Sequence, residues 1–125
     1  MLVLDAGAFV AVERGSRDGV TLIKRERLAG RSPVTCGGVV AELWRGGSGR
    51  QVPTARLLAG TDVVPIDDRL GRRAGMVLAR SGQSDAIDAA VVCLAADGDD
   101  ILTSDPGDLH ALAQAAEVHV ELVPV

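Results

Sequence analysis

The sequence predicts an α/β fold built on a mainly parallel sheet. Short apolar segments of strand length alternate along the chain with longer segments of helical pattern, which is typical of strand–helix–strand units. The first apolar segment, Leu2–Leu4, has no polar position, as expected for a strand that is covered on both faces. Phe9 and Trp44 are the only aromatic residues among 125, so the core must be formed by Val, Leu, Ile and Ala.

In the first half of the chain, the apolar positions and the breaks between them define six expected elements. Val20, Ile23 and Leu28 form an approximate apolar stripe on one helix. A later helix is expected to stop at Gly46–Gly49, because a glycine run disfavours helical structure. The expected strands are Leu2–Asp5 and Pro33–Thr35, and the expected helices are Gly7–Glu13, Asp18–Ala29, Gly38–Arg45 and Val52–Ala59.

The second half continues the alternation of strands and helices. The helix expected over Asp67–Arg80 is amphipathic, and its inward positions are Leu70, Ala74, Val77 and Leu78. Ser84–Ala96 is a more apolar helix and is therefore expected to lie deeper. The remaining expected elements are the helix Asp105–Ala115 and strands at Val63–Val64 with Ile66, at Ile101–Thr103 and at Val118–Val123.

Length, charge and apolar runs narrow the function classes. A chain of 125 residues fits one domain, which we expect to cover residues 1–125. The net charge of -4 counts against a general nucleic-acid-coating protein, but not against a site where bound metal ions reverse the local sign. No apolar run is long enough to span a membrane, and we expect a cytoplasmic protein. Cys36 and Cys93 are interpreted as small buried apolar residues.

Five carboxylates occupy positions where an α/β fold brings strand ends and helix starts together. Asp5 ends the first expected strand, and Asp105 follows a later one. Ligands of open α/β sheets bind at the carboxyl ends of the strands, so both acids are at the correct edge. Asp85 and Asp88 are three residues apart and share a helix face. Glu42 lies within a largely apolar helix, where a solvated position explains it equally well.

Several of these acids also have a purely structural interpretation. Ser84 with Asp88 would form a capping pair, or Asp85 would cap the helix alone. The run Ser104–Asp108 is a good helix start, because Pro favours the first helical turn. Asp5 is the hardest to explain by structure alone, since it ends an apolar strand.

Taken together, the acids favour a divalent cation site. Crowded carboxylates repel one another, which raises some of their pKa values or requires a cation. Oxygen ligands without Cys or His favour Mg²⁺ or Mn²⁺ over zinc. Two such ions can activate a water and stabilise the leaving oxygen during phosphodiester hydrolysis.

The segments around these acids resemble those of PIN domains of the VapC toxin type, and the resemblance runs nearly end to end. The matching segments are Val3–Ala8, Val39–Arg45, Ser84–Ala90 and Leu102–Leu109. One such segment is a weak signal, but four in the family's order are fairly specific. The resemblance implies a three-layer α/β/α PIN-like domain over residues 1–125, with a mainly parallel central sheet.

The resemblance also implies roles for the five acids. Asp5 would be the central metal ligand, and Asp88 and Asp105 would complete the site. Glu42 would hold a second ion or orient water. Asp85 is expected as an accessory acid, because Asp88 better fits the family pattern of an Asp followed by small apolar residues.

Hydroxyl side chains are common near the first and fourth acids of such sites. Thr103 and Ser104 lie near the fourth acid, but Gly7 stands where the first segment often has a hydroxyl. One water-positioning contact is therefore in question.

By resemblance, the activity is endonucleolytic cleavage of RNA through metal-activated water, with Mg²⁺ or Mn²⁺ as cofactor. The compact length suggests the toxin of a toxin–antitoxin pair, for which a small antitoxin protein and a homodimer are the expected partners. Phosphate contacts are expected from Arg14, Arg45 and Arg50, whereas Arg72 and Arg73 are more typical of solvated helix faces.

Three other interpretations compete with this one. A receiver domain would need an acidic pair after the first strand and a late Lys, whereas the only Lys is Lys24. A non-catalytic PIN-like scaffold is the main alternative, and the retained acids argue against it. DNA is a third possibility, since RNA is preferred by resemblance alone. His110 and His119 lack metal-like spacing and are interpreted as structural.

Overall fold

Five strands form one sheet in the computed structural model, which describes residues 1–125. The strands lie in the order β3-β2-β1-β4-β5, and every neighbouring pair is parallel. The carboxyl ends of all strands therefore meet at one edge, which we call the carboxyl edge. The strands are β1 (Leu2–Leu4), β2 (Val34–Cys36), β3 (Asp62–Val64), β4 (Asp100–Thr103) and β5 (Glu121–Pro124).

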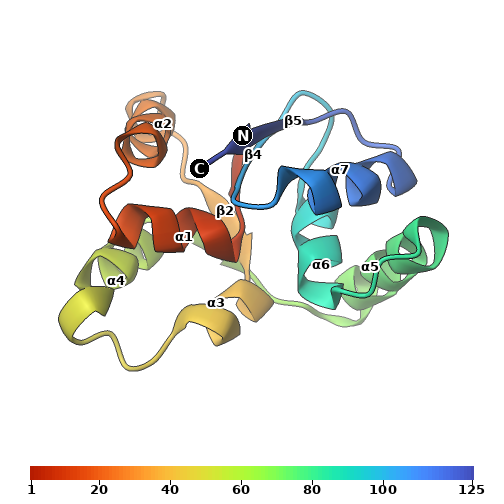
Figure 1. The fold of residues 1–125 in the computed structure, drawn as a ribbon, viewed down its shortest axis with the longest axis horizontal. Coiled ribbons are helices and arrows are strands. Elements are labelled where there is room, and N and C mark those ends of the chain that lie inside the picture. The colour runs from red at the N-terminus through yellow and green to blue at the C-terminus, as the bar shows by residue number, and fades with distance from the viewer.

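Helices cover both faces of the sheet, as Figure 1 shows, and confirm the predicted three-layer α/β/α architecture. The first layer contains α1 (Ala6–Glu13), α2 (Arg17–Leu28), α3 (Gly37–Leu43) and α4 (Val52–Ala59), with a 3₁₀ turn at Gly49–Gln51. The second layer contains α5 (Asp68–Ser81), α6 (Ala86–Leu94) and α7 (Pro106–Ala115). Helix α1 packs on α2, α3 and α4, whereas α5, α6 and α7 pack on one another.

All predicted helices and strands are present, and the differences lie at their ends. Strand β3 stops at Val64 and excludes Ile66, because Pro65 has no N–H for the strand ladder. Strand β5 begins at Glu121 rather than Val118, after a turn in which Glu117 has a φ of 56°.

One contiguous core of 23 buried residues joins the sheet to both helical layers. It is almost entirely aliphatic, with Phe9 fully buried, as the composition predicts. Residues Ala89–Cys93 of α6 are all buried, which confirms that this helix lies deep. Both cysteines are buried and free, as expected. No helix is long and apolar enough to cross a membrane.

The predicted apolar stripe of α2 was wrong at one end. Leu28 is 88% exposed, whereas Ile23 and the carboxylate Glu26 are buried. Leu28 lies five residues after Ile23 and so points away from the buried face, whereas Glu26 lies three residues after Ile23 on that face and is neutralised inside the fold. Its side chain accepts hydrogen bonds from the backbone N–H of Leu2 and from the guanidinium of Arg31.

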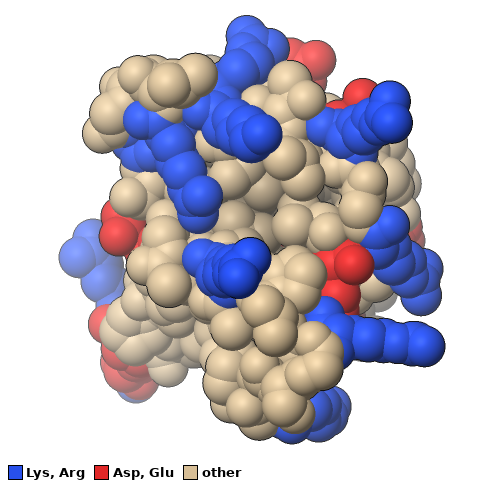
Figure 2. All heavy atoms as spheres, turned by 90° about the vertical axis from the view of Figure 1, so that its left-hand side faces the viewer, with Lys and Arg blue, Asp and Glu red and all other residues tan.

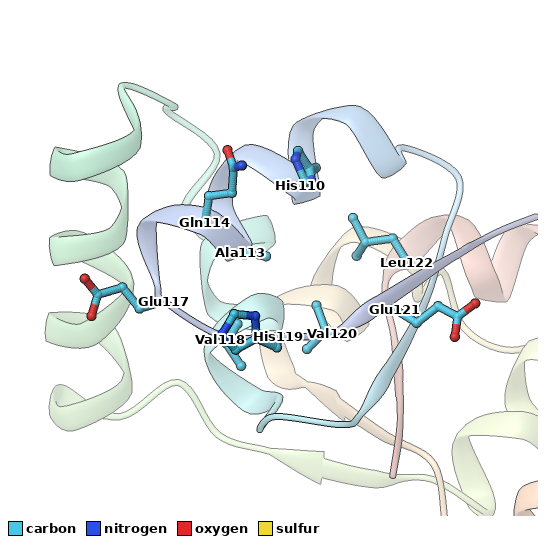
Figure 3. Close-up of a pocket in the computed structure, with 9 residues that line it drawn as sticks. All are labelled: His110, Ala113, Gln114, Glu117, Val118, His119, Val120, Glu121 and Leu122. Atoms are coloured by element: carbon cyan, nitrogen blue, oxygen red, sulfur yellow. The ribbon is translucent and has the colours of Figure 1, made fainter.

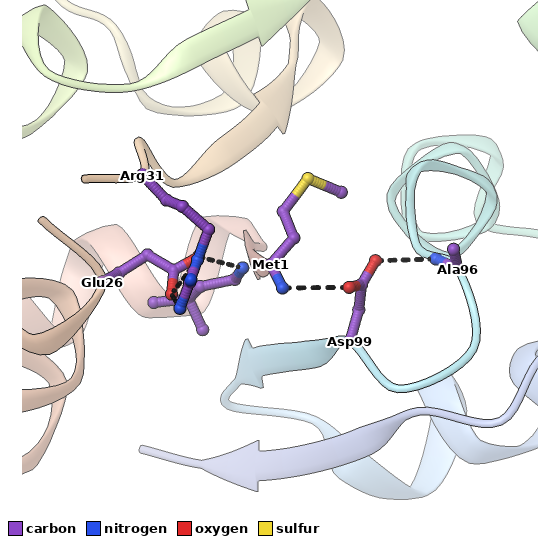
Figure 4. A network of polar contacts seen from close by, with 6 residues as sticks. Met1, Glu26, Arg31, Ala96 and Asp99 are labelled. Carbon is purple, nitrogen blue, oxygen red and sulfur yellow. Dashed lines mark hydrogen bonds and ion pairs between the residues drawn. The ribbon is translucent and has the colours of Figure 1, made fainter. Parts of the chain in front are cut away.

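Two carboxylates near the amino ends of β1 and β4, Glu26 and Asp99, are paired, as Figure 4 shows. Glu26 Oε2 lies 2.8 Å from Leu2 N, and its Oε1 lies 2.9 Å from Arg31 Nη2. The Asp99 carboxylate accepts hydrogen bonds from the terminal ammonium of Met1 at 3.0 Å and from the backbone N–H of Ala96 at 2.8 Å. Glu26 and Asp99 are therefore both neutralised by basic groups at this end of the sheet.

Replacing Glu26 with Gln should lower the free energy of unfolding at pH 7 by about 1–3 kcal/mol, because it removes a partly buried ion pair. Hydrogen bonding to Arg31 lowers the pKa of Glu26. This stabilisation is thus present above the unfolded-state pKa and is lost as the pH falls through the lower folded-state pKa. Urea unfolding at pH 7 and pH 3.5 should show a difference from wild type that narrows at the lower pH. Asp68→Asn, which breaks the exposed pair with Arg72, is the control and should change little.

Candidate functional site

The carboxyl edge brings together acids that are far apart in the sequence. Strands β1 and β4 are neighbours, with Leu4 opposite Leu102. Asp5 follows β1, and its backbone N–H donates to the carbonyl of Leu102 at 3.3 Å. Asp105 follows β4 by two residues. The edge between these two strands therefore holds the first and the last of the predicted acids.

Asp5 is fixed by hydrogen bonds to both of its carboxylate oxygens. It is only 5% exposed and caps α1, where Oδ1 accepts the backbone N–H of Ala8 at 2.9 Å. Oδ2 accepts the hydroxyl of Thr103. Burial raises the pKa of Asp5, while the hydrogen bonds from Thr103 and Ala8 oppose that rise. The result is a rigidly oriented carboxylate with lone pairs left for a cation.

Thr103 couples the first acid to the last. Its side chain is fully buried; the hydroxyl donates to Asp5, and its oxygen accepts the backbone N–H of Asp105 at 2.9 Å. Asp105 itself precedes α7 without making a side-chain cap hydrogen bond. The run Ser104–Asp108 does start a helix, as predicted, with Pro106 in the first turn, but the Asp105 carboxylate is not engaged in capping it.

Helix α6 presents the next two acids, which play different parts. Asp85 caps the helix alone, because its Oδ1 accepts the backbone N–H groups of Ile87 and Asp88, both at 3.0 Å. Asp88 lies in the first turn, is half-buried and makes no side-chain hydrogen bond. The capping pair of Ser84 with Asp88 is absent.

The strongest electrostatic effect of the site falls on Asp88. Burial, followed by the negative charges of its neighbours, raises the pKa of Asp88 to about 6. In order of effect, these neighbours are Asp85, Asp5, Glu42 and Asp105. All five predicted acids therefore share one electrostatic neighbourhood.

Glu42 and Asp108 extend this neighbourhood at its rim. Glu42 is exposed on α3, yet partial desolvation and then the charges of Asp85 and Asp5 raise its pKa. Asp108 lies one turn into α7, and a hydrogen bond with Asp105 raises its pKa. Asp108 was not singled out from the sequence, although its spacing of three from Asp105 places it on the same helix face.

None of these acids has a basic partner. The three ion pairs of the chain involve Asp99, Glu26 and Asp68, and none includes one of the five predicted acids or Asp108. No three of the His, Cys, Asp and Glu side chains converge closely enough to form a complete metal-ligand group. The carboxyl edge therefore holds gathered but unneutralised oxygen donors, in contrast to the paired acids of Figure 4.

Comparison with known proteins shows the family and the fold. The sequence matches the PIN domain family over residues 2–123. The chain belongs to the PIN-domain family. A search of curated proteins finds no match. The fold is similar to that of a chain in the crystal structure of VapBC2 from Rickettsia felis bound to a DNA fragment from their promoter, with a TM-score of 0.70 and 10% sequence identity over 97% of both chains.

Basic residues of this PIN domain concentrate in its first half, whereas most acidic residues follow residue 60. Figure 2 shows Lys and Arg side chains spread over the face at the left of Figure 1, where the first helical layer lies. Arg14 and Arg50 line a cleft of about 460 Å³ between α1 and the start of α4, together with Val10, Glu13, Gly49 and Pro53.

Two further arginines considered from the sequence, Arg45 and Arg72, lie elsewhere. Arg45 donates to the carbonyls of Ala41 and Trp44 at 3.3 and 2.7 Å, so its guanidinium is held against its own helix end. Arg72 pairs with Asp68 at 2.9 Å on an exposed helix face, in agreement with a solvated position.

A wide hollow of this PIN domain lies away from its five predicted acids. It measures about 960 Å³ and lies between the second half of α7 and the start of β5, as Figure 3 shows. His110 and His119 line it from separate elements, and both are exposed. Because none of the five predicted acids lines this hollow, size alone does not identify the site.

Proposed function

We propose that this PIN domain is a metal-dependent endoribonuclease. One observation carries the proposal: five carboxylates from four separate chain segments share the carboxyl edge of the sheet without a basic partner. Burial, and then the charges of the other four acids, raise the pKa of Asp88 to about 6. Unneutralised acids that lie close together destabilise the folded state. Their presence in one place therefore indicates a function that requires a cation.

The donor set fits Mg²⁺ or Mn²⁺. All candidate ligands are carboxylate oxygens, and the nearest thiol, Cys36, is buried with a raised pKa. Asp5, Asp88 and Asp105 would hold the ion, and Glu42 would contribute to a second one. Asp85 is an accessory acid, because one of its oxygens already accepts two backbone N–H groups. When bound, the metal supplies an activated water and neutralises charge on the phosphate.

The protein's own groups set the orientation of the ligands. Ala8 N–H and Thr103 Oγ1 hold the two oxygens of Asp5 in one rotamer, and Thr103 ties Asp105 to the same point. Outer hydrogen bonds of this kind typically contribute about 10–100-fold to metal affinity or activity. Thr103 therefore positions two ligands without touching the substrate.

RNA is the proposed substrate by resemblance to the VapC type, and the basic face over the first helical layer suits a nucleic-acid backbone. A bound cation would attract the scissile phosphate, and the flanking phosphates would need cations along the strand. The cleft of Arg14 and Arg50 lies near the far end of α1, about 12 Å along the helix from Asp5 at 1.5 Å per residue. This separation suits contact with the RNA backbone beyond the cleaved bond.

By resemblance to the VapC type, we also propose a toxin role, a cognate antitoxin protein as partner, a homodimeric assembly and a cytoplasmic location. The similar fold in VapBC2 from Rickettsia felis supports the antitoxin partner. An antitoxin would be expected to bring a basic residue to the unneutralised acids.

Incubating the purified chain, free of any co-purified partner, with total RNA and tRNA in Mn²⁺ should give discrete fragments. EDTA should abolish them, and so should Asp5→Asn. Asn preserves the helix cap and side-chain volume, so the variant should remain folded. Asp18→Asn, which removes an exposed acid of α2, is the matched control and should cleave like wild type.

Fragments that persist in EDTA, or in Asp5→Asn, would contradict the proposal. Cleavage of single-stranded DNA at a rate equal to that of RNA would reassign the substrate. Absence of both cleavage and Mn²⁺ binding would favour the alternative of a non-catalytic PIN-like scaffold.

A further inference from the structure

The side chain of Ser104 occupies the space next to Gly7. A Cβ atom added to Gly7 would lie 1.9 Å from Ser104 Oγ, 2.5 Å from Ser104 Cβ and 3.0 Å from Ser104 N. Contacts this short do not occur in folded proteins, and the Ser104 backbone is fixed by β4 next to it. Residue 7 must therefore be glycine as long as residue 104 carries its present side chain.

This pair of residues lies beside the central acid of the site. Gly7 is in the first turn of α1, two residues after Asp5, and Ser104 lies between Thr103 and Asp105. The backbone N–H groups of Ser104 and Gly7 also oppose the rise in the pKa of Asp5 that burial causes. The hydroxyl of Ser104 lies against the first turn of α1, two residues along the chain from Asp5.

The Ser104 hydroxyl differs from that of its neighbour in being free. Thr103 Oγ1 is buried and is used both as a donor and as an acceptor. Ser104 is exposed, and its hydroxyl takes part in none of the side-chain hydrogen bonds of the chain. Among the acceptor-only carboxylates, it is a side-chain donor that remains available to a negatively charged oxygen.

We propose that Ser104 Oγ donates a hydrogen bond to a non-bridging oxygen of the phosphodiester being cleaved. Gly7, which has no side chain, leaves the space that the Ser104 side chain occupies. This inference rests on the proposed nuclease function. Ser104, which directly follows β4, thus supplies a hydroxyl at a point where Gly7 has none. A hydrogen bond to the phosphate that strengthens as charge develops would act on the chemical step rather than on RNA binding.

The test is a set of variants assayed on a defined RNA oligonucleotide that the wild type cleaves in Mn²⁺. Ser104→Ala removes one oxygen from an exposed side chain, so its melting temperature should match wild type. Its kcat should fall by roughly 10–100-fold with little change in KM, because a donor to the reacting group is lost. Its Mn²⁺ affinity should be unchanged, which separates this role from metal binding.

A second set of variants moves the hydroxyl from residue 104 to residue 7. Gly7→Ser alone should lower the melting temperature, because its Cβ collides with Ser104. The double variant Gly7→Ser with Ser104→Gly moves the hydroxyl to the other side of the same space. It should recover stability and should cleave at least about 10-fold faster than Ser104→Gly alone.

Wild-type kcat in Ser104→Ala, in a preparation where Asp5→Asn is inactive, would overturn the inference and leave the nuclease function standing. A folded double variant no faster than Ser104→Gly would also overturn it. An inactive wild type on every RNA would overturn the proposed function, and this inference with it.

Discussion

Asp88→Asn is expected to raise stability and to abolish activity in the same molecule. At pH 7 the folded protein carries an ionised Asp88 although its pKa is raised to about 6 by burial and by the other acids. Because the folded-state pKa lies above the unfolded-state value, ionisation disfavours the folded state. An uncharged side chain of the same size removes this penalty. We expect a gain of about 1–2 kcal/mol, after allowing for solvent screening of a half-buried group.

The same change should lower RNA cleavage by at least roughly 100-fold, since it removes a proposed metal ligand and such losses exceed those of outer-shell residues. Thermal unfolding in EDTA and cleavage in Mn²⁺ measure the two effects on one preparation. The wild type should also become more stable as the pH falls from 7 towards 5, as Asp88 takes up a proton in the folded state; the Asn variant should lose most of that gain. An unaltered cleavage rate, or a loss of stability, would remove Asp88 from the site.

Asp5→Asn is expected to have the second large effect, on cation binding. Asp5 is buried and held by Thr103 and Ala8, so no other acid can move into its place. Asn keeps an acceptor for the Ala8 N–H but lacks the negative charge that attracts a divalent ion. Affinity for Mn²⁺ should therefore fall at least about 10-fold, more than for Asp85→Asn, because Asp85 is already engaged as a helix cap.

Much of the fold was predictable because strand and helix periods dominate this sequence. Uniformly apolar strands such as Leu2–Leu4 identify a parallel sheet covered on both faces. The errors arise from contacts that periodicity does not reveal. Leu28 was placed on the apolar stripe of its helix, whereas the buried residue is Glu26, whose burial depends on Arg31 and on the distant backbone of Leu2.

The sequence was enough to predict which acids belong to the site and that they lie at strand ends. It was not enough to predict the contacts that they make. The positions of Asp5 and Asp105 follow from the parallel order of β1 and β4, which the sequence only suggested. The different parts of Asp85 and Asp88 depend on which oxygen accepts a backbone N–H. The close approach of Gly7 and the Ser104 side chain involves residues nearly a hundred positions apart, so no local pattern could reveal it.

The most direct test of the central claim is a calorimetric titration of the metal-free chain with Mn²⁺ at pH 7, with Asp5→Asn and the control Asp18→Asn alongside. We expect saturable binding to the wild type and to Asp18→Asn, and binding at least about 10-fold weaker to Asp5→Asn. Equal binding by all three proteins, or no binding by the wild type, would contradict a cation site at the carboxyl edge.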